Sequence, residues 1–145
     1  MKKIVAVSLL SLALAGCVNP GKASVQPDQL KTHRFVLENI DGKAVTSKAT
    51  PPEIRFSAQP DISLINNIAV SGMMCNSFNG QGKLSEGELK VKNLAMTRKL
   101  CTEPQLNALD QTLSDMLRKG AQVDLTEDQL TLATADKTLM FKRVE

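Results

Sequence analysis

The sequence has very few aromatic side chains. It contains no tryptophan and no tyrosine, and phenylalanine occurs four times in 145 residues. A hydrophobic core must therefore be built mainly from Leu, Ile, Val and Met, and few flat side chains are left on which nucleic acid bases could stack. The composition argues against single-stranded nucleic acid as a partner, and we expect the chain to bind no nucleic acid.

A large excess of one charge is also missing. The formal net charge is +3, and Lys2 and Lys3 at the N-terminus supply two of those charges. The other basic residues are interspersed with Asp and Glu, so the sequence predicts no acidic partner. The length of 145 residues and a hydrophobic content of 42% are typical of a single globular domain.

Side chains that carry out catalysis or bind metals are scarce. His33 is the one histidine, and it is far in sequence from Cys75, for which a catalytic role would require a base. Cys75 and Cys101 are isolated from one another, whereas a zinc site needs four ligands at paired spacings. We therefore predict no catalytic, metal-binding or cofactor-binding residues, and we expect that the protein is not an enzyme.

The glycine-rich residues 71–82, SGMMCNSFNGQG, do not match a phosphate-binding loop. Gly82-Lys83 is present, but Ser77 and Leu84 replace the first glycine and the hydroxyl residue of that motif. We interpret the segment as a strand that ends in a tight turn. Gly80 and Gly82 would allow positive φ or close backbone approach, and Asn76 and Asn79 would bond their own backbone.

Residues 1–16 are predicted to be a secretory signal peptide. Two lysines precede an apolar segment at 4–14, which is too short to span a bilayer and is followed by small residues. Leu14-Ala15-Gly16-Cys17 resembles the lipobox of bacterial lipoproteins. That resemblance implies cleavage before Cys17 and acylation of this cysteine, so the expected partner is the membrane, through the lipid.

The residues after the lipobox predict a location and a tether. By resemblance to Gram-negative lipoproteins, Val18 in place of Asp implies the outer membrane, with the domain facing the periplasm. Residues 17–30 form the lipidated N-terminus and a flexible tether, because their polar, Pro- and Gly-containing composition is typical of linkers. The globular domain is expected at 31–145.

Alternating hydrophobic residues predict strands along most of this domain. Residues 33–40 and 43–47 flank Asp41-Gly42, which is a strong hairpin signal. A second hairpin is predicted around Asn66-Asn67. The further predicted strands are 53–58, 61–65, 68–74, 87–93, 122–125, 129–134 and 138–144.

One helix is predicted after Thr102, which would be its N-cap with Gln105 completing a capping box. Gly120 would end it. The hydrophobic face comprises Leu106, Leu109, Leu113, Met116 and Leu117. This order of elements predicts an α+β domain, in which a curved, mostly antiparallel sheet packs on a single main helix.

Two cysteines remain once Cys17 carries lipid. In an oxidising compartment, an even pair favours a disulfide between Cys75 and Cys101. The alternative is that both are thiols packed as small hydrophobic groups.

Several ordered segments resemble the META domain family. GMMCNSFNG contains Gly72, Cys75, Asn76 and Gly80, and LAMTRKLC contains Met96, Thr97 and Cys101. The opening segment FVLENIDGKAV and the closing segments LTLAT and TLMFK extend the likeness across the whole globular part, from about Leu30 to Glu145. The sequence departs from the family pattern at three places. This chain has Phe35 where many members have Trp, Gly82 where they have an aromatic residue, and Lys99-Leu100 where they have Met-Ala.

The resemblance implies a barrel-like fold and a stress-related envelope role, linked to heat shock and antibiotic tolerance, without catalytic residues. The expected molecule is a monomer that has an envelope protein as a possible partner. META domains also resemble secretion pilotins. The alternative function is therefore a module that binds an apolar segment of an envelope or secretion protein, or an acyl chain. An enzyme is the weakest alternative.

Overall fold

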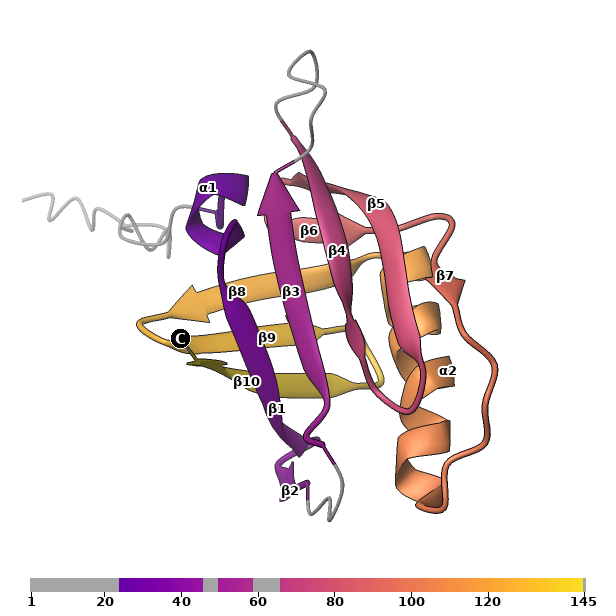
Figure 1. Ribbon diagram of the computed structural model, residues 1–145. Coiled ribbons are helices and arrows are strands. Elements are labelled where there is room, and N and C mark those ends of the chain that lie inside the picture. Colours follow the sequence, from indigo (N-terminus) through magenta and orange to yellow (C-terminus); the bar gives the residue numbers. More distant parts are fainter. Residues whose placement is uncertain (1–23, 46–49, 59–65, 145) are drawn as a thin grey trace, which may run out of the picture.

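The computed structural model describes residues 24–45, 50–58 and 66–144 (Figure 1). In chain order the elements are α1 (Pro27–Leu30), β1 (Arg34–Ile40), β2 (Lys43–Ala44), β3 (Glu53–Ala58), β4 (Asn67–Met73), β5 (Ser77–Ser85), β6 (Glu88–Lys90), β7 (Ala95–Met96), α2 (Pro104–Lys119), β8 (Ala121–Thr126), β9 (Gln129–Ala133) and β10 (Thr138–Val144). The predicted signal peptide and Cys17 lie outside the described residues.

The described strands form a closed antiparallel barrel. Its order is β1-β3-β4-β5-β6-β8-β9-β10, and pairing of β10 with β1 closes the ring. The short strands β2 and β7 are additions that pair with β1 and β5. α2 lies along one side of the barrel, beside β5 and β6 (Figure 1). The predicted α+β class, with a barrel-like antiparallel sheet packed on one main helix, is confirmed.

The core fills the barrel and continues under α2. Alternate residues of the strands face inward, as the period of two predicts, so that Phe35, Ile54 and Phe141 are fully buried. Leu109, Leu113 and Leu117 of α2 belong to the same hydrophobic cluster. The helix is therefore held by the hydrophobic face that the sequence predicts.

The hairpin predicted at Asp41-Gly42 is present. Both residues have positive φ, 51° and 83°, which is the geometry of the two-residue turn that best fits twisted strands. The Asp41 carboxylate accepts hydrogen bonds from the Thr138 backbone N–H (2.8 Å) and from Lys137 Nζ (3.2 Å). The Thr138 bond first, and then the Lys137 bond, hold the pKa of Asp41 below its usual value. The returning strand β2 covers only Lys43–Ala44.

Two of the described strands were not predicted, namely β5 and β7. Ser77–Ser85 form the nine-residue strand β5, whereas only a turn was expected there. The turn itself comprises residues 74–76 and joins β4 to β5. The predicted strand 61–65, and with it half of the second hairpin, lies outside the described residues.

The packed domain begins before residue 31. Leu30 is fully buried and Val25 is 7% exposed, and the Thr32 N–H donates to the Phe56 carbonyl (3.0 Å). The predicted tether therefore extends too far, because residues 25–30 already pack on the barrel. Their polar neighbours conceal this, since the three buried residues Val25, Pro27 and Leu30 have no regular helical or strand spacing.

The predicted capping box at Thr102 is wrong. α2 begins at Pro104, with Glu103 as N-cap and no side-chain cap hydrogen bond. Leu106 N and Asn107 N donate to the Glu103 carbonyl instead (3.1 and 3.4 Å). Pro104 fixes this start, because its φ suits the first helical position and it has no N–H to lose.

Candidate functional site

Two features of the structure are candidates for function. The first is a polar cluster at the turn between β4 and β5, which contains three of the predicted motif residues, Cys75, Asn76 and Thr97. We call it the Asn76 cluster, and it comprises Cys75, Asn76, Thr97, Lys99 and Asp110. The second is an open groove on the outer surface beside β5 and β6.

Asn76 is the one polar residue among the described buried residues, with 6% of its surface exposed. Its Oδ1 accepts hydrogen bonds from Thr97 Oγ1 (2.9 Å) and from the Lys99 N–H (2.8 Å). Its Nδ2 donates to Asp110 Oδ2 (2.7 Å) and to the Lys99 carbonyl (3.0 Å). Each side-chain polar atom of Asn76 is thus satisfied, which is the condition for burying an amide without a large cost.

Asp110 attaches this turn to α2. Its Oδ1 accepts the backbone N–H groups of both Cys75 and Asn76, each at 3.0 Å. Asn107, one turn earlier, accepts from the Cys101 N–H (3.0 Å) and donates to the Cys101 carbonyl (2.9 Å). α2 therefore holds two loops of the barrel through side chains three residues apart on the same face.

A disulfide joins Cys75 to Cys101, with 5.9 Å between their Cα atoms. This is the predicted pairing, and it links the turn after β4 to the segment that leads into α2. Cys75 is buried with 2% of its surface exposed. The cluster and the disulfide fix the same junction, so they act on the same structural element.

The remaining motif residues also have packing roles. Gly72 has φ 156°, and a Cβ at that position would collide with the Glu53 carbonyl and with the Phe78 ring. A Cβ at Gly80 would lie 2.8 Å from Cγ1 of Val91. Gly80 has no positive φ, so close approach, and not a left-handed turn, requires the glycine there. Met96 packs at the edge of the core.

The roles expected for two asparagines are wrong. Neither Asn76 nor Asn79 has a positive φ. Asn76 bonds Thr97, Lys99 and Asp110 across the fold, as described above, and Asn79 is an exposed residue within β5. The sequence does not reveal Asp110, because its partners Cys75 and Asn76 are 35 and 34 positions away. It does not reveal Asn107 either, because the partner Cys101, six positions away, lies in the loop before the helix.

Replacing Asp110 with alanine should lower the free energy of unfolding by about 1–3 kcal/mol. The change leaves the N–H groups of Cys75 and Asn76 without their acceptor, and an unsatisfied buried donor has a cost of that order. Urea denaturation followed by circular dichroism would measure it. Asp115→Ala is the matched control, since Asp115 lies on the same helix and bonds exposed side chains. Equal losses for the two variants would contradict the proposed attachment.

The groove arises where the pairing between β5 and its neighbours is interrupted. β5 pairs with β6 up to Lys83–Lys90 and with β7 from Asn79–Ala95. Between these pairs three residues of β5 lie opposite four residues, 91–94. The Val91 N–H donates to the Leu117 carbonyl of α2 (2.8 Å), so this segment bends toward the helix and away from β5.

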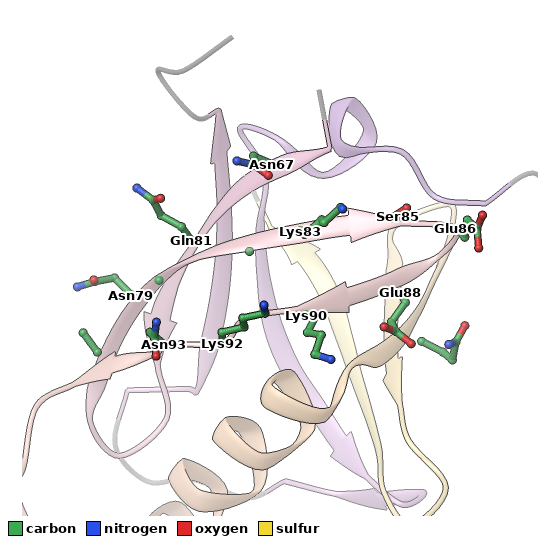
Figure 2. Close-up of a pocket in the computed structure, with 14 residues that line it drawn as sticks. Asn67, Asn79, Gln81, Lys83, Ser85, Glu86, Glu88, Lys90, Lys92 and Asn93 are labelled. Carbon is green, nitrogen blue, oxygen red and sulfur yellow. The ribbon is translucent and has the colours of Figure 1, made fainter. Parts of the chain in front are cut away.

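The resulting groove has a volume of about 940 Å³. Its lining consists of amide, hydroxyl and charged side chains, apart from two glycines and Ala95. Figure 2 shows Asn79 and Asn93 at one end and Glu86 and Glu88 at the other, with lysines between them. This lining does not provide the contiguous apolar surface that a module for apolar segments would need.

Few other features of the described part suggest a site. Among the described residues, Leu100 is the large hydrophobic residue that is exposed, with 89% of its surface accessible. Residues 24–45, 50–58 and 66–144 contain no group of three or more His, Cys, Asp and Glu side chains placed to hold a metal ion. None of the helices described is long and apolar enough to cross a membrane.

The fold and the motif cluster define a META domain protein. The family model for the META domain matches residues 28–145, and the chain belongs to that family. It is 56% identical over 142 residues to heat shock protein HslJ of Escherichia coli (strain K12). The aligned residues cover 98% of this chain and 96% of that protein. This similarity supports a role related to heat shock or stress.

Solved structures agree with the fold. The protein in one NMR structure is 58% identical in sequence to this chain, and the two folds superpose with a TM-score of 0.70. The match covers 81% of this chain and 94% of the other chain. A second NMR structure, of a protein from Burkholderia xenovorans, is 21% identical with a TM-score of 0.59, over 88% of this chain and 97% of its own. The second shows the fold alone.

Proposed function

We propose that the chain is a non-enzymatic lipoprotein of the bacterial outer membrane that acts in the stress response, including antibiotic tolerance. Its META domain would be held at the periplasmic face through lipid on Cys17. The observation that carries this proposal is the lipobox-like segment Leu14–Cys17 placed directly before a domain of the META family. The similarity to a heat shock protein extends over 98% of the chain, and it supports the stress-related part.

The position of Cys17 relative to the fold supports anchoring close to the membrane. The described fold begins at Ser24 and is firmly packed from Val25 onward. Seven residue steps separate Cys17 from Ser24, and a chain extends by at most about 3.6 Å per residue. The first packed residues would therefore lie within about 25 Å of the lipidated cysteine.

The bonding of the motif residues supports a role other than catalysis. The polar atoms of Asn76 and the carboxylate of Asp110 bond one another and the neighbouring backbone. A general acid or base needs a polar atom free to contact substrate, whereas these groups are engaged in holding the turn. The most distinctive residues of the domain thus stabilise its fold.

Cys17→Ala should release the protein from the outer membrane. One acyl chain gives marginal membrane binding, and several make anchoring stable, so removing the acylation site removes the attachment. Fractionation of cells under high salt, followed by immunoblotting, measures the distribution. Val18→Ala is the matched control and should stay in the outer membrane. A Cys17→Ala protein that still sediments with the outer membrane would contradict the lipoprotein assignment.

The stress-related part is tested by survival. Cells that lack this protein should lose viability faster after a temperature upshift, and the wild-type gene should restore survival. Cys17→Ala should restore less, because the domain would be misplaced. Equal survival with and without the gene, under heat and under antibiotic exposure, would contradict the stress role while leaving the anchoring result unaffected.

A further inference from the structure

We propose that the groove beside β5 and β6 binds a ligand that carries phosphate, either a small soluble molecule or the headgroup of a lipid. Lys83, Lys90 and Lys92 would supply the positive charge, and amide side chains would bind the polar atoms around the phosphate. Neither the family membership nor the proposed function assigns a ligand to this surface. Binding there does not depend on acylation of Cys17, so loss of anchoring and loss of binding are separate results.

Among the described residues, the lysines of the groove have no ion-pair partner. Three lysines line the groove, and the ion pairs of the described residues involve other groups, namely Lys31, Arg34, Arg55, Arg118 and Lys137. Within the described part of the chain, no carboxylate thus lies within ion-pair distance of these three ammonium groups. Two glutamates also line the groove, so the three lysines leave it with an excess of one positive charge. An excess of positive charge on a concave surface attracts anions.

The three lysines lie between the two ends of the groove (Figure 2). Lys83 projects from β5. Lys90 is the last residue of β6, and Lys92 follows two positions later (Figure 2). Glu86 lies at the β5–β6 turn, and Glu88, the first residue of β6, lies between that turn and Lys90 (Figure 2). The positive charge of the groove is therefore concentrated in its middle. An anionic group would bind there, between the strands, and not at the β5–β6 turn.

Amide side chains supply hydrogen-bonding groups in the same groove. Asn79 and Gln81 project from β5, and Asn93 lies across the groove from them (Figure 2). The hydrogen bonds between described residues leave these three amide side chains without a partner. Each amide can donate and accept, so they can bind hydroxyl or ester oxygens next to an anion.

The residue types favour phosphate over other anions and over apolar ligands. The basic side chains of the lining are all lysines, and lysine binds phosphate as a point charge. No aromatic side chain lines the groove, so recognition of a base by stacking is not provided. A phosphate carrying two negative charges can be shared among several ammonium groups.

The groove is also kept open by its backbone. Gly80 and Gly82 of β5 face the interior, where Val91 fills the space that their side chains would take, while Asn79, Gln81 and Lys83 of the same strand face the groove. The interruption between the Lys83–Lys90 and Asn79–Ala95 pairs holds the two walls apart. The separation of the walls is thus a consequence of strand register, and it exists before a ligand binds.

The test uses the full lipidated chain, labelled with ¹⁵N and inserted in nanodiscs of phosphatidylcholine. Titration with glycerol 3-phosphate should shift the amide signals of Gln81–Lys83 and residues 90–93, while glycerol alone should not. Raising the salt concentration should weaken the binding, because exposed charges are screened. In nanodiscs that contain phosphatidylglycerol, shifts present before titration would identify a lipid headgroup as the source, and their absence would identify a soluble ligand.

Matched variants separate the site from general charge. Lys83→Gln combined with Lys92→Gln should weaken binding of glycerol 3-phosphate about tenfold. Lys119→Gln combined with Lys142→Gln removes the same charge from exposed positions outside the groove and should leave the affinity unchanged. The proposal is overturned if both double variants lose affinity equally, if glycerol shifts the same signals, or if neither phosphate source shifts the groove.

Discussion

Replacing Leu113 with alanine should lower the free energy of unfolding by about 2–5 kcal/mol. Leu113 is fully buried and occupies the middle of the α2 face that packs on the barrel. The substitution removes apolar contacts and leaves a cavity that the rigid barrel wall cannot fill. Urea denaturation of the wild type and the variant, followed by circular dichroism, measures the difference.

Gln111→Ala is the control for this experiment, since Gln111 lies on the exposed face of the same helix. An exposed substitution of this kind changes stability by about 0.5 kcal/mol or less. If Leu113→Ala also changed it by less than that amount, α2 would not be covering the core, and the packing described above would be wrong.

Removing the disulfide should lower the free energy of unfolding by about 3 kcal/mol. Cys75 and Cys101 are separated by 26 positions, and a link of that span restricts the unfolded chain more than the folded one. Cys75→Ala combined with Cys101→Ala avoids leaving a free thiol. Its thermal midpoint should fall while the far-ultraviolet spectrum persists, because the hydrophobic face of α2 and the Asp110 bonds remain.

Addition of reductant to the wild type should have the same effect as the double substitution, and it should not affect the double variant further. Alkylation of protein purified without reductant provides the decisive control. Two cysteines alkylated in the native domain would show that the disulfide does not form, and Cys75 would then be a buried thiol that stabilises the core by packing.

Local sequence patterns predict much of the fold. The Asp41-Gly42 hairpin is foreseeable because a two-residue turn with positive φ at both positions favours those residues. The face containing Leu109, Leu113 and Leu117 predicts the helix and the surface that it buries. These features depend on residues a few positions apart, so a single sequence contains the information.

β5 illustrates what local patterns do not reveal. Its inward positions include Gly80 and Gly82, where Val91 supplies the apolar contact from another segment. The alternation of hydrophobic and polar residues is therefore hidden, although the outward series Asn79, Gln81 and Lys83 does have the period of a strand. That polar series is also the sequence signal from which one wall of the groove could have been predicted.

The Asn76 cluster depends on contacts between distant parts of the chain. Asp110 is 34 positions from Asn76, and no local rule relates a carboxylate on a helix to a turn between strands. The groove has a similar origin, because it arises from the unequal number of residues on two facing segments. The resemblance to the META family indicates which residues matter here, and the structure gives the physical reason.

The mass of the N-terminal peptide tests the central claim most directly. The protein would be extracted from membranes, digested, and analysed by mass spectrometry without prior removal of lipid. The account predicts a first residue of Cys17 whose mass is raised by diacylglyceryl and acyl groups. A mature protein that begins at any other residue, or at an unmodified Cys17, would contradict the assignment of this META domain to a lipid anchor.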